Sequence, residues 1–170
     1  VHGRGAQRPE CIRGARVAHQ LGLHSLILSY RNDQEAPATE DNRYGLGFTE
    51  WEDIQAGIDY ALGHGASDVV LFGWSMGGAI VLRTTELTRY RDRIRALVLT
   101  GPVVDWYELL AQSGLPAGED GSTAHRFLYF PDENHWILKP ANARTWYETV
   151  LAFVGEHVLG QEQERPELLG

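Results

Sequence analysis

Residues 69–80 read VVLFGWSMGGAI, and this stretch decides the fold. A short apolar run stops at Gly73, and a segment compatible with a helix begins at Gly78. Between them, Ser75 stands between Gly73 and Gly77, which makes a G-x-S-x-G motif in a strand-to-helix context. Such a turn presents a nucleophilic serine, and its glycines are needed because neighbouring β-carbons would collide there. We therefore predict that Ser75 is a nucleophile at the carboxyl edge of a sheet.

The composition is that of an ordinary globular domain. Of 170 residues, 43% are hydrophobic and 22% are charged, so residues 1–160 are expected to form one domain, followed by a polar tail at residues 161–170. The net charge of −8 disfavours nucleic acid and anionic membranes as partners. We see neither a signal peptide nor an apolar run approaching the roughly 20 residues of a membrane span, and we expect a cytoplasmic protein.

Apolar runs of strand length alternate with helical patterns along the chain. Strands are expected at residues 25–30, 68–73, 95–100 and 126–130. Helices are expected at residues 9–21, 77–88, 105–112 and 140–159, with one more opening at a capping box formed by Thr49 and Glu52. This alternation predicts an α/β fold with a mostly parallel sheet and helices on both faces.

Ser75 needs a base that takes its proton, and the chain has seven histidines. Only His135 follows the carboxyl end of an expected strand late in the chain, where this type of sheet carries its histidine. We therefore predict His135 as the general base. His2 lies in a glycine-rich turn, residues 1–5, which we call the first loop. The remaining histidines fall near helix ends or before strands: His19, His24, His64, His125 and His157.

These motifs resemble the α/β-hydrolase fold over most of residues 1–159. His2 with Gly3 matches the oxyanion loop, residues 73–77 match the nucleophile turn, and Asn134 with His135 matches the histidine loop. We call residues 131–139 the histidine loop.

Two branches of that fold are suggested by longer stretches. Residues 73–78 and 130–140 are similar to the catalytic domain of prolyl-oligopeptidase-like serine peptidases. Residues 30–32, together with residues 44–60, look more like small bacterial esterases and lipases.

The resemblance implies roles for further residues. The oxyanion donors would be the main-chain N–H groups of Met76 and Arg4. His2 would be structural, with its ring bonded to loop backbone, and Asp33 and Arg31 are candidates for ordering the same loop. Five residues flank the strand ends and would either line an apolar acyl pocket or pack in the core: Trp74, Val103, Val104, Trp106 and Trp136.

The acid that should orient His135 is harder to assign. In the family it usually follows an apolar strand between residues 95–100 and the histidine's strand, and no such strand is visible. We rank Asp105 first, because it follows the strand at residues 95–100, and Asp120 second. Asp132 is expected to be salt-bridged or solvated.

The strand that should lead into His2 has shrunk to Val1. A missing strand leaves a gap of roughly 10 Å between its neighbours. Either residues 25–30 pair directly with residues 68–73, or the chain is a truncated or internally shortened hydrolase, which is the alternative we favour.

The sequence predicts a serine hydrolase that cleaves carboxylic esters through an acyl-enzyme intermediate. No metal or other cofactor is expected, because metal-ligand motifs and a phosphate-binding glycine loop are absent. The partner would be a small-molecule ester or a short peptide, and the oligomeric state stays open. A serine exopeptidase or oligopeptidase of the prolyl-oligopeptidase type is the enzymatic alternative, favoured by residues 130–140. A degenerate hydrolase that acts as a binding protein is the other, favoured by the missing acid strand.

Overall fold

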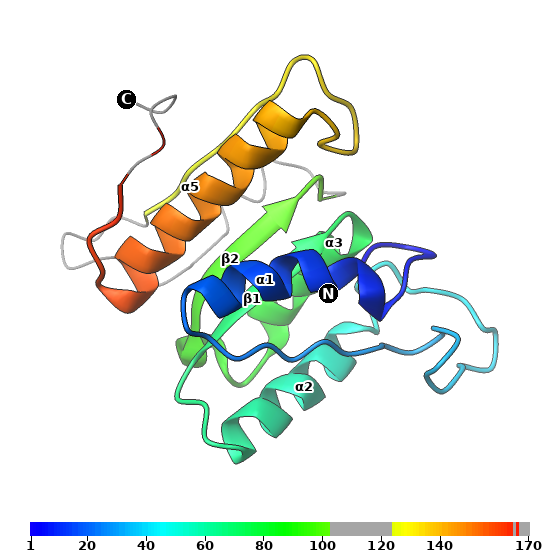
Figure 1. Ribbon diagram of the computed structural model, residues 1–170. Helices are drawn as coiled ribbons and strands as arrows, with labels where there is room; N and C mark the ends of the chain where they lie inside the picture. The colour runs from blue at the N-terminus through cyan, green and yellow to red at the C-terminus, as the bar shows by residue number, and fades with distance from the viewer. Residues whose placement is uncertain (103–123, 165, 167–170) are drawn as a thin grey trace.

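A computed structural model describes residues 1–102, 124–164 and 166 of the chain (Figure 1). Its elements, in chain order, are η1 (Arg8–Cys11), α1 (Ile12–Gln20), α2 (Trp51–Gly63), β1 (Val69–Trp74), α3 (Met76–Leu87), η2 (Arg91–Arg93), β2 (Ile94–Thr100) and α5 (Pro140–Leu159). Among the described residues, no helix is both long and apolar enough to cross a membrane.

The two strands β1 and β2 run parallel, with Leu71 opposite Leu97 and Trp74 opposite Thr100. Parallel neighbours need a crossover, and α3 supplies it. Val1 bonds to the other edge of β1: its amino group donates to the Phe72 carbonyl at 2.5 Å, and its carbonyl accepts the Trp74 N–H at 3.1 Å. Val1 thus lies where the resemblance expects the strand that leads into His2.

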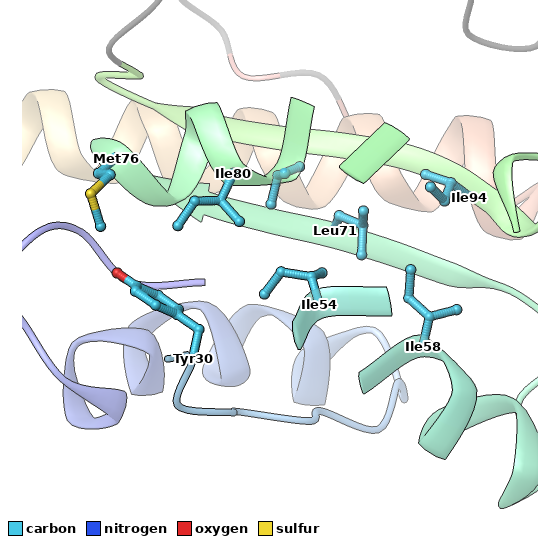
Figure 2. Packing of buried hydrophobic residues seen from close by; sticks show 8 residues of the cluster. Tyr30, Ile54, Ile58, Leu71, Met76, Ile80 and Ile94 are labelled. Carbon is cyan, nitrogen blue, oxygen red and sulfur yellow. The ribbon is translucent and has the colours of Figure 1, made fainter. Parts of the chain in front are cut away.

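Helices cover both faces of the strand pair, as predicted. On one face, α2 and α3 pack against β1 through a cluster shown in Figure 2 that includes Tyr30, Ile54, Ile58, Leu71 and Ile80. On the other face, α1 and α5 pack against β2 through Val17, Val98, Trp146, Val150 and Val154. Successive strand residues serve opposite faces, since Leu71 belongs to the first cluster while Phe72 packs against the second.

The predictions of two of the four strands are wrong. Residues 25–30 and 126–130 have no strand structure, and β1 and β2 form the only sheet within the described part of the chain. A strand exists only where a neighbour accepts its hydrogen bonds, and Val1 already occupies the carboxyl end of the free edge of β1. Residues 25–30 do not pair with residues 68–73. Within this segment, Leu28 instead lies against Gly57 of α2.

Three of the predicted helices correspond to helices of the structure. The helix at residues 140–159 is confirmed as α5, residues 77–88 correspond to α3, and residues 9–21 divide into η1 and α1. The helix expected at residues 105–112 lies outside the described residues.

The prediction of a capping box at Thr49 and Glu52 is wrong. Glu50, not Thr49, is the N-cap of α2, and its carboxylate accepts the N–H groups of Gly45 and Gly47 instead of capping the helix. Glu52 points away from the cap and pairs with Arg31 at 2.8 Å.

Candidate active site

Ser75 occupies the one-residue turn between β1 and α3. Its backbone has a positive φ of 53° with ψ −121°, a combination that residues with a side chain rarely adopt. Such a conformation costs a non-glycine residue on the order of 1–3 kcal/mol and is typical of functional sites. The Ser75 N–H donates to the carbonyl of Thr100 at 2.9 Å, which fastens the turn to the end of β2. Ser75 therefore lies at the carboxyl edge of the strand pair.

The two glycines of the motif allow backbones to approach more closely than a β-carbon would permit. A β-carbon at Gly73 would lie 2.6 Å from the Gly77 carbonyl oxygen. At Gly77 it would lie 2.3 Å from the Val1 carbonyl oxygen and 2.5 Å from that of His2. The steric reason predicted for these glycines is confirmed. At Gly77, the absence of a side chain also allows the first loop to pack against the turn.

The first loop packs directly against the serine. A β-carbon at Gly3 would lie 3.1 Å from Cβ of Ser75. Met76 opens α3, so its N–H has no acceptor within the helix and sits at the positive end of the helix dipole. The N–H of Gly3 donates to Glu10 at 2.8 Å, whereas no hydrogen bond found among the described residues uses the N–H of Arg4. Met76 and Arg4 remain the predicted oxyanion donors.

His2 is a structural residue of the first loop, as predicted. Its side chain is fully buried, Nδ1 lies 3.0 Å from the Gly3 carbonyl, and Nε2 lies 2.8 Å from Oδ2 of Asp33. Its ring stacks on Tyr30 with the centroids 4.4 Å apart. Loop backbone, carboxylate and aromatic ring together fix this imidazole in one orientation.

The carboxylate of Asp33 holds the first loop in place through a set of hydrogen bonds. Besides His2, its carboxylate accepts the Tyr30 N–H at 2.9 Å and the Tyr44 hydroxyl at 3.0 Å. Burial and, secondarily, the Asp33 carboxylate raise the pKa of the Tyr30 phenol, so this phenol stays protonated. Arg31, the other candidate, has no such role. It lies 2.8 Å from Asp53 and anchors to α2.

His135 lies at the same edge as Ser75. A β-carbon at Gly101 would be 3.2 Å from Nδ1 of His135, so the ring lies against this glycine. Gly101 directly follows Thr100, whose carbonyl holds the Ser75 N–H. The ends of β1 and β2 therefore bring the predicted nucleophile and the predicted base to one side of the molecule. The five remaining histidines outside the first loop are exposed, as is His135 itself.

The histidine loop is fastened to the start of α5 by exposed polar contacts. Lys139 Nζ lies 2.6 Å from Asp132, and Asn142 donates to Asp132 at 3.0 Å and to Glu133 at 2.9 Å. The hydrogen bond from Lys139, followed by that from Asn142, lowers the pKa of Asp132. Asp132 is thus salt-bridged, as predicted.

The structure describes neither candidate acid, and it describes two of the five predicted pocket residues, Trp74 and Trp136. Asp105, Asp120, Val103, Val104 and Trp106 lie outside the described residues, and their roles stay predictions. Trp74 is 3% exposed, and its ring covers Gly14 of α1 and stacks on Phe72 at 4.7 Å, so it packs in the core. Trp136 is exposed and sets its ring edge-on to His135 at 5.8 Å. No cluster of metal-ligating side chains occurs in the described ranges.

Sequence reasoning missed two charged residues next to the site. Glu10 holds the Gly3 N–H, and the Arg13 guanidinium lies over the rings of both Trp74 and Trp136. Their spacing of three residues at the start of the first helix, right after the His2–Gly3 pair, was the available signal.

Comparison with known proteins gives a family and several relatives. Residues 49–148 match the family described as serine aminopeptidase, S33. The probable dipeptidyl-peptidase 5 of Aspergillus clavatus is 32% identical over 84 residues, which are 49% of this chain and 10% of that protein. The dipeptidyl-peptidase 5 of Trichophyton schoenleinii is 36% identical over 74 residues, covering 43% of this chain and 9% of the relative. The chain thus spans about a tenth of the length of these curated relatives.

One solved structure is also similar, the crystal structure of a probable hydrolytic enzyme from Pseudomonas aeruginosa PAO1. It matches with a TM-score of 0.48 and 22% identity, over 68% of this chain and 34% of the neighbour.

Proposed function

The chain belongs to the serine aminopeptidase S33 family of α/β-hydrolases, and from this premise we propose that it is a serine hydrolase that cleaves carboxylic esters through an acyl-enzyme. The observation that supports this most strongly is the strained, positive-φ backbone of Ser75 between β1 and α3. A serine backbone of this kind, beside a helix N-terminus and a histidine-bearing loop, suits acyl transfer.

In the proposed mechanism, the Ser75 hydroxyl attacks the acyl carbon while His135 takes its proton. The carbonyl oxygen becomes an oxyanion and accepts hydrogen bonds from the N–H groups of Met76 and Arg4. The tetrahedral intermediate then collapses, the bond to the leaving group breaks, and His135 returns the proton to the departing oxygen. Water, deprotonated by His135, releases the acid and restores Ser75.

The acid that would orient His135 is still assigned to Asp105 or Asp120. Among the described carboxylates of the histidine loop, Asp132 pairs with Lys139, and Glu133 accepts the N–H of Lys139 at 2.8 Å. Both groups are therefore engaged by the loop itself, which supports the search for an acid elsewhere.

A second candidate is hydrolysis of short peptides by the same serine. It is favoured by the relatives named dipeptidyl-peptidase 5. The chemistry is the same except that His135 would protonate a departing amine. Turnover of p-nitrophenyl butyrate without turnover of dipeptidyl p-nitroanilides supports the esterase, and the reverse preference supports the peptidase.

Labelling by a fluorophosphonate probe tests the proposal itself. We expect wild-type protein to be labelled and Ser75→Ala to be inert, because only an activated serine reacts with the probe. The matched variant is Ser67→Ala, which changes an exposed serine before β1 and should label normally. Folded wild-type protein that resists labelling would favour the degenerate binding protein.

A further inference from the structure

The side chain of Arg13 lies between two tryptophans that belong to different parts of the candidate site. Its guanidinium carbon is 5.0 Å from the centre of the Trp74 ring and 5.1 Å from that of Trp136. Trp74 directly precedes Ser75, and Trp136 directly follows His135. A guanidinium within about 6 Å of an indole face is attracted by the ring quadrupole. Arg13 therefore bridges the segments that carry the predicted nucleophile and base.

Glu10 extends this bridge to the first loop. One of its carboxylate oxygens accepts the Gly3 N–H at 2.8 Å, and the other lies 3.2 Å from Nη2 of Arg13. The Glu10 side chain is 11% exposed and that of Arg13 is 33% exposed, so water screens this ion pair only in part. Glu10 fixes the backbone one residue before Arg4, the predicted oxyanion donor.

The Arg13 guanidinium is held by the two ring contacts together with its ion pair to Glu10. Nε of Arg13 is buried and has no hydrogen-bond partner among the described residues. Burying a polar group without a partner is unfavourable, and the ring contacts and the Glu10 ion pair help to offset that cost. A planar guanidinium can lie against two ring faces, whereas the compact ammonium of lysine cannot do so in the same way.

We propose that Arg13 is a positioning residue that sets the first loop and the histidine loop at the spacing that acyl transfer requires. The inference rests on the proposed hydrolase function of Ser75 and His135. Arg13 reaches the first loop through Glu10 and the histidine loop through Trp136, and it touches neither reacting atom. Displacements of about 1 Å between groups that act together can cost on the order of a hundredfold in rate, so such a link has a measurable effect.

The test compares Arg13→Met with Arg16→Met, an exposed arginine on the same helix, in the full-length protein. Arg13→Met keeps the length of the side chain but removes its charge and its planar face. We expect its kcat for p-nitrophenyl butyrate and its fluorophosphonate labelling rate to fall about tenfold with KM little changed, and Arg13→Lys to recover little of the loss. Arg16→Met should behave as wild type. Unchanged kcat in a folded Arg13→Met variant would overturn the inference.

A double-mutant cycle with Trp136→Ala separates positioning from a general structural effect. Trp136 is 44% exposed, so its removal should leave the protein folded. If Arg13 acts through this ring, the rate loss in the double variant is smaller than the product of the two single losses, while independent losses that multiply would contradict the inference. If Arg13→Met fails to fold, the link is tested by two variants of Trp136. Trp136→Phe keeps an aromatic ring and should react at nearly the wild-type rate, whereas Trp136→Ala should be slower. Equal rates in these two variants would refute the link. A wild-type protein that does not label would instead overturn the proposed function, and the inference with it.

Discussion

The first loop packs against Ser75 and the histidine loop packs against Gly101 at the end of β2, but the two loops are held by different kinds of contact. The first loop is buried: His2 is fully enclosed, and its Nε2 lies 2.8 Å from an Asp33 carboxylate whose side chain is 3% exposed. The histidine loop is fastened from outside, by a Lys139–Asp132 pair whose side chains are 55% and 50% exposed. The contacts of the first loop are therefore shielded from solvent, whereas those of the histidine loop are exposed to it.

This contrast suggests different roles for the two loops: the first loop contributes to the stability of the fold, and the histidine loop positions His135. Buried polar groups are costly to leave unpaired, so the Asp33 network links the first loop to the integrity of the fold. Exposed ion pairs contribute little to stability because water and salt screen them. The contacts of the histidine loop can therefore fix where His135 sits without adding much to the free energy of unfolding. Variants in the two loops should separate these effects.

The largest expected effect is that of Asp33→Ala. It leaves His2 Nε2, the Tyr30 N–H and the Tyr44 hydroxyl without their acceptor, and we expect a loss of about 3–5 kcal/mol in the free energy of unfolding. Urea denaturation measures it. Asp68→Ala removes an exposed carboxylate and should change little. If the two variants were equally stable, the buried network would not hold the first loop.

Gly77→Ala comes next and acts through sterics. A β-carbon there would meet the Val1 carbonyl oxygen at 2.3 Å, so the first loop has to move away from α3. We expect a loss of about 1–3 kcal/mol together with a strong fall in the rate of fluorophosphonate labelling. Gly63→Ala, at a helical position with open space around it, should instead stabilise α2 by up to about 1 kcal/mol. Normal labelling of Gly77→Ala would contradict a first loop seated against Ser75.

Local signals in the sequence predicted local structure well. The turn at Ser75 follows from two glycines between a strand and a helix, and α5 follows from a proline at its start and an apolar stripe that includes Trp146 and Val150. Both depend on residues near one another in the chain, where steric and periodic rules act directly.

Features that depend on a distant partner were not predictable. Residues 25–30 have the composition of a strand, but composition does not supply the neighbouring strand with which to pair. Thr49 and Glu52 match a capping box, yet the Glu50 carboxylate binds Gly45 and Gly47 and Glu52 is drawn to Arg31. The bridge through Arg13 joins residues of three segments that only the tertiary fold brings together.

The smallest effect on stability is expected in the histidine loop, from Asp132→Asn. Hydrogen bonds from Lys139 and Asn142 lower the pKa of Asp132, so its carboxylate adds stability above its ordinary pKa of 3.8, and this is lost as the pH falls through the lower folded value. The thermal midpoint of the variant should therefore lie slightly below that of wild type at neutral pH, and the gap should close in acid.

The matched control for Asp132→Asn is Glu148→Gln, which removes the charge of another exposed pair, the one with Arg144 farther along α5. Both changes should alter stability slightly, but only Asp132→Asn should slow fluorophosphonate labelling, because only it loosens the loop that carries His135. A thermal shift as large as that of Asp33→Ala would show that the histidine loop is built into the fold as firmly as the first loop. Equal labelling rates in the two variants would show that the exposed pair does not place His135.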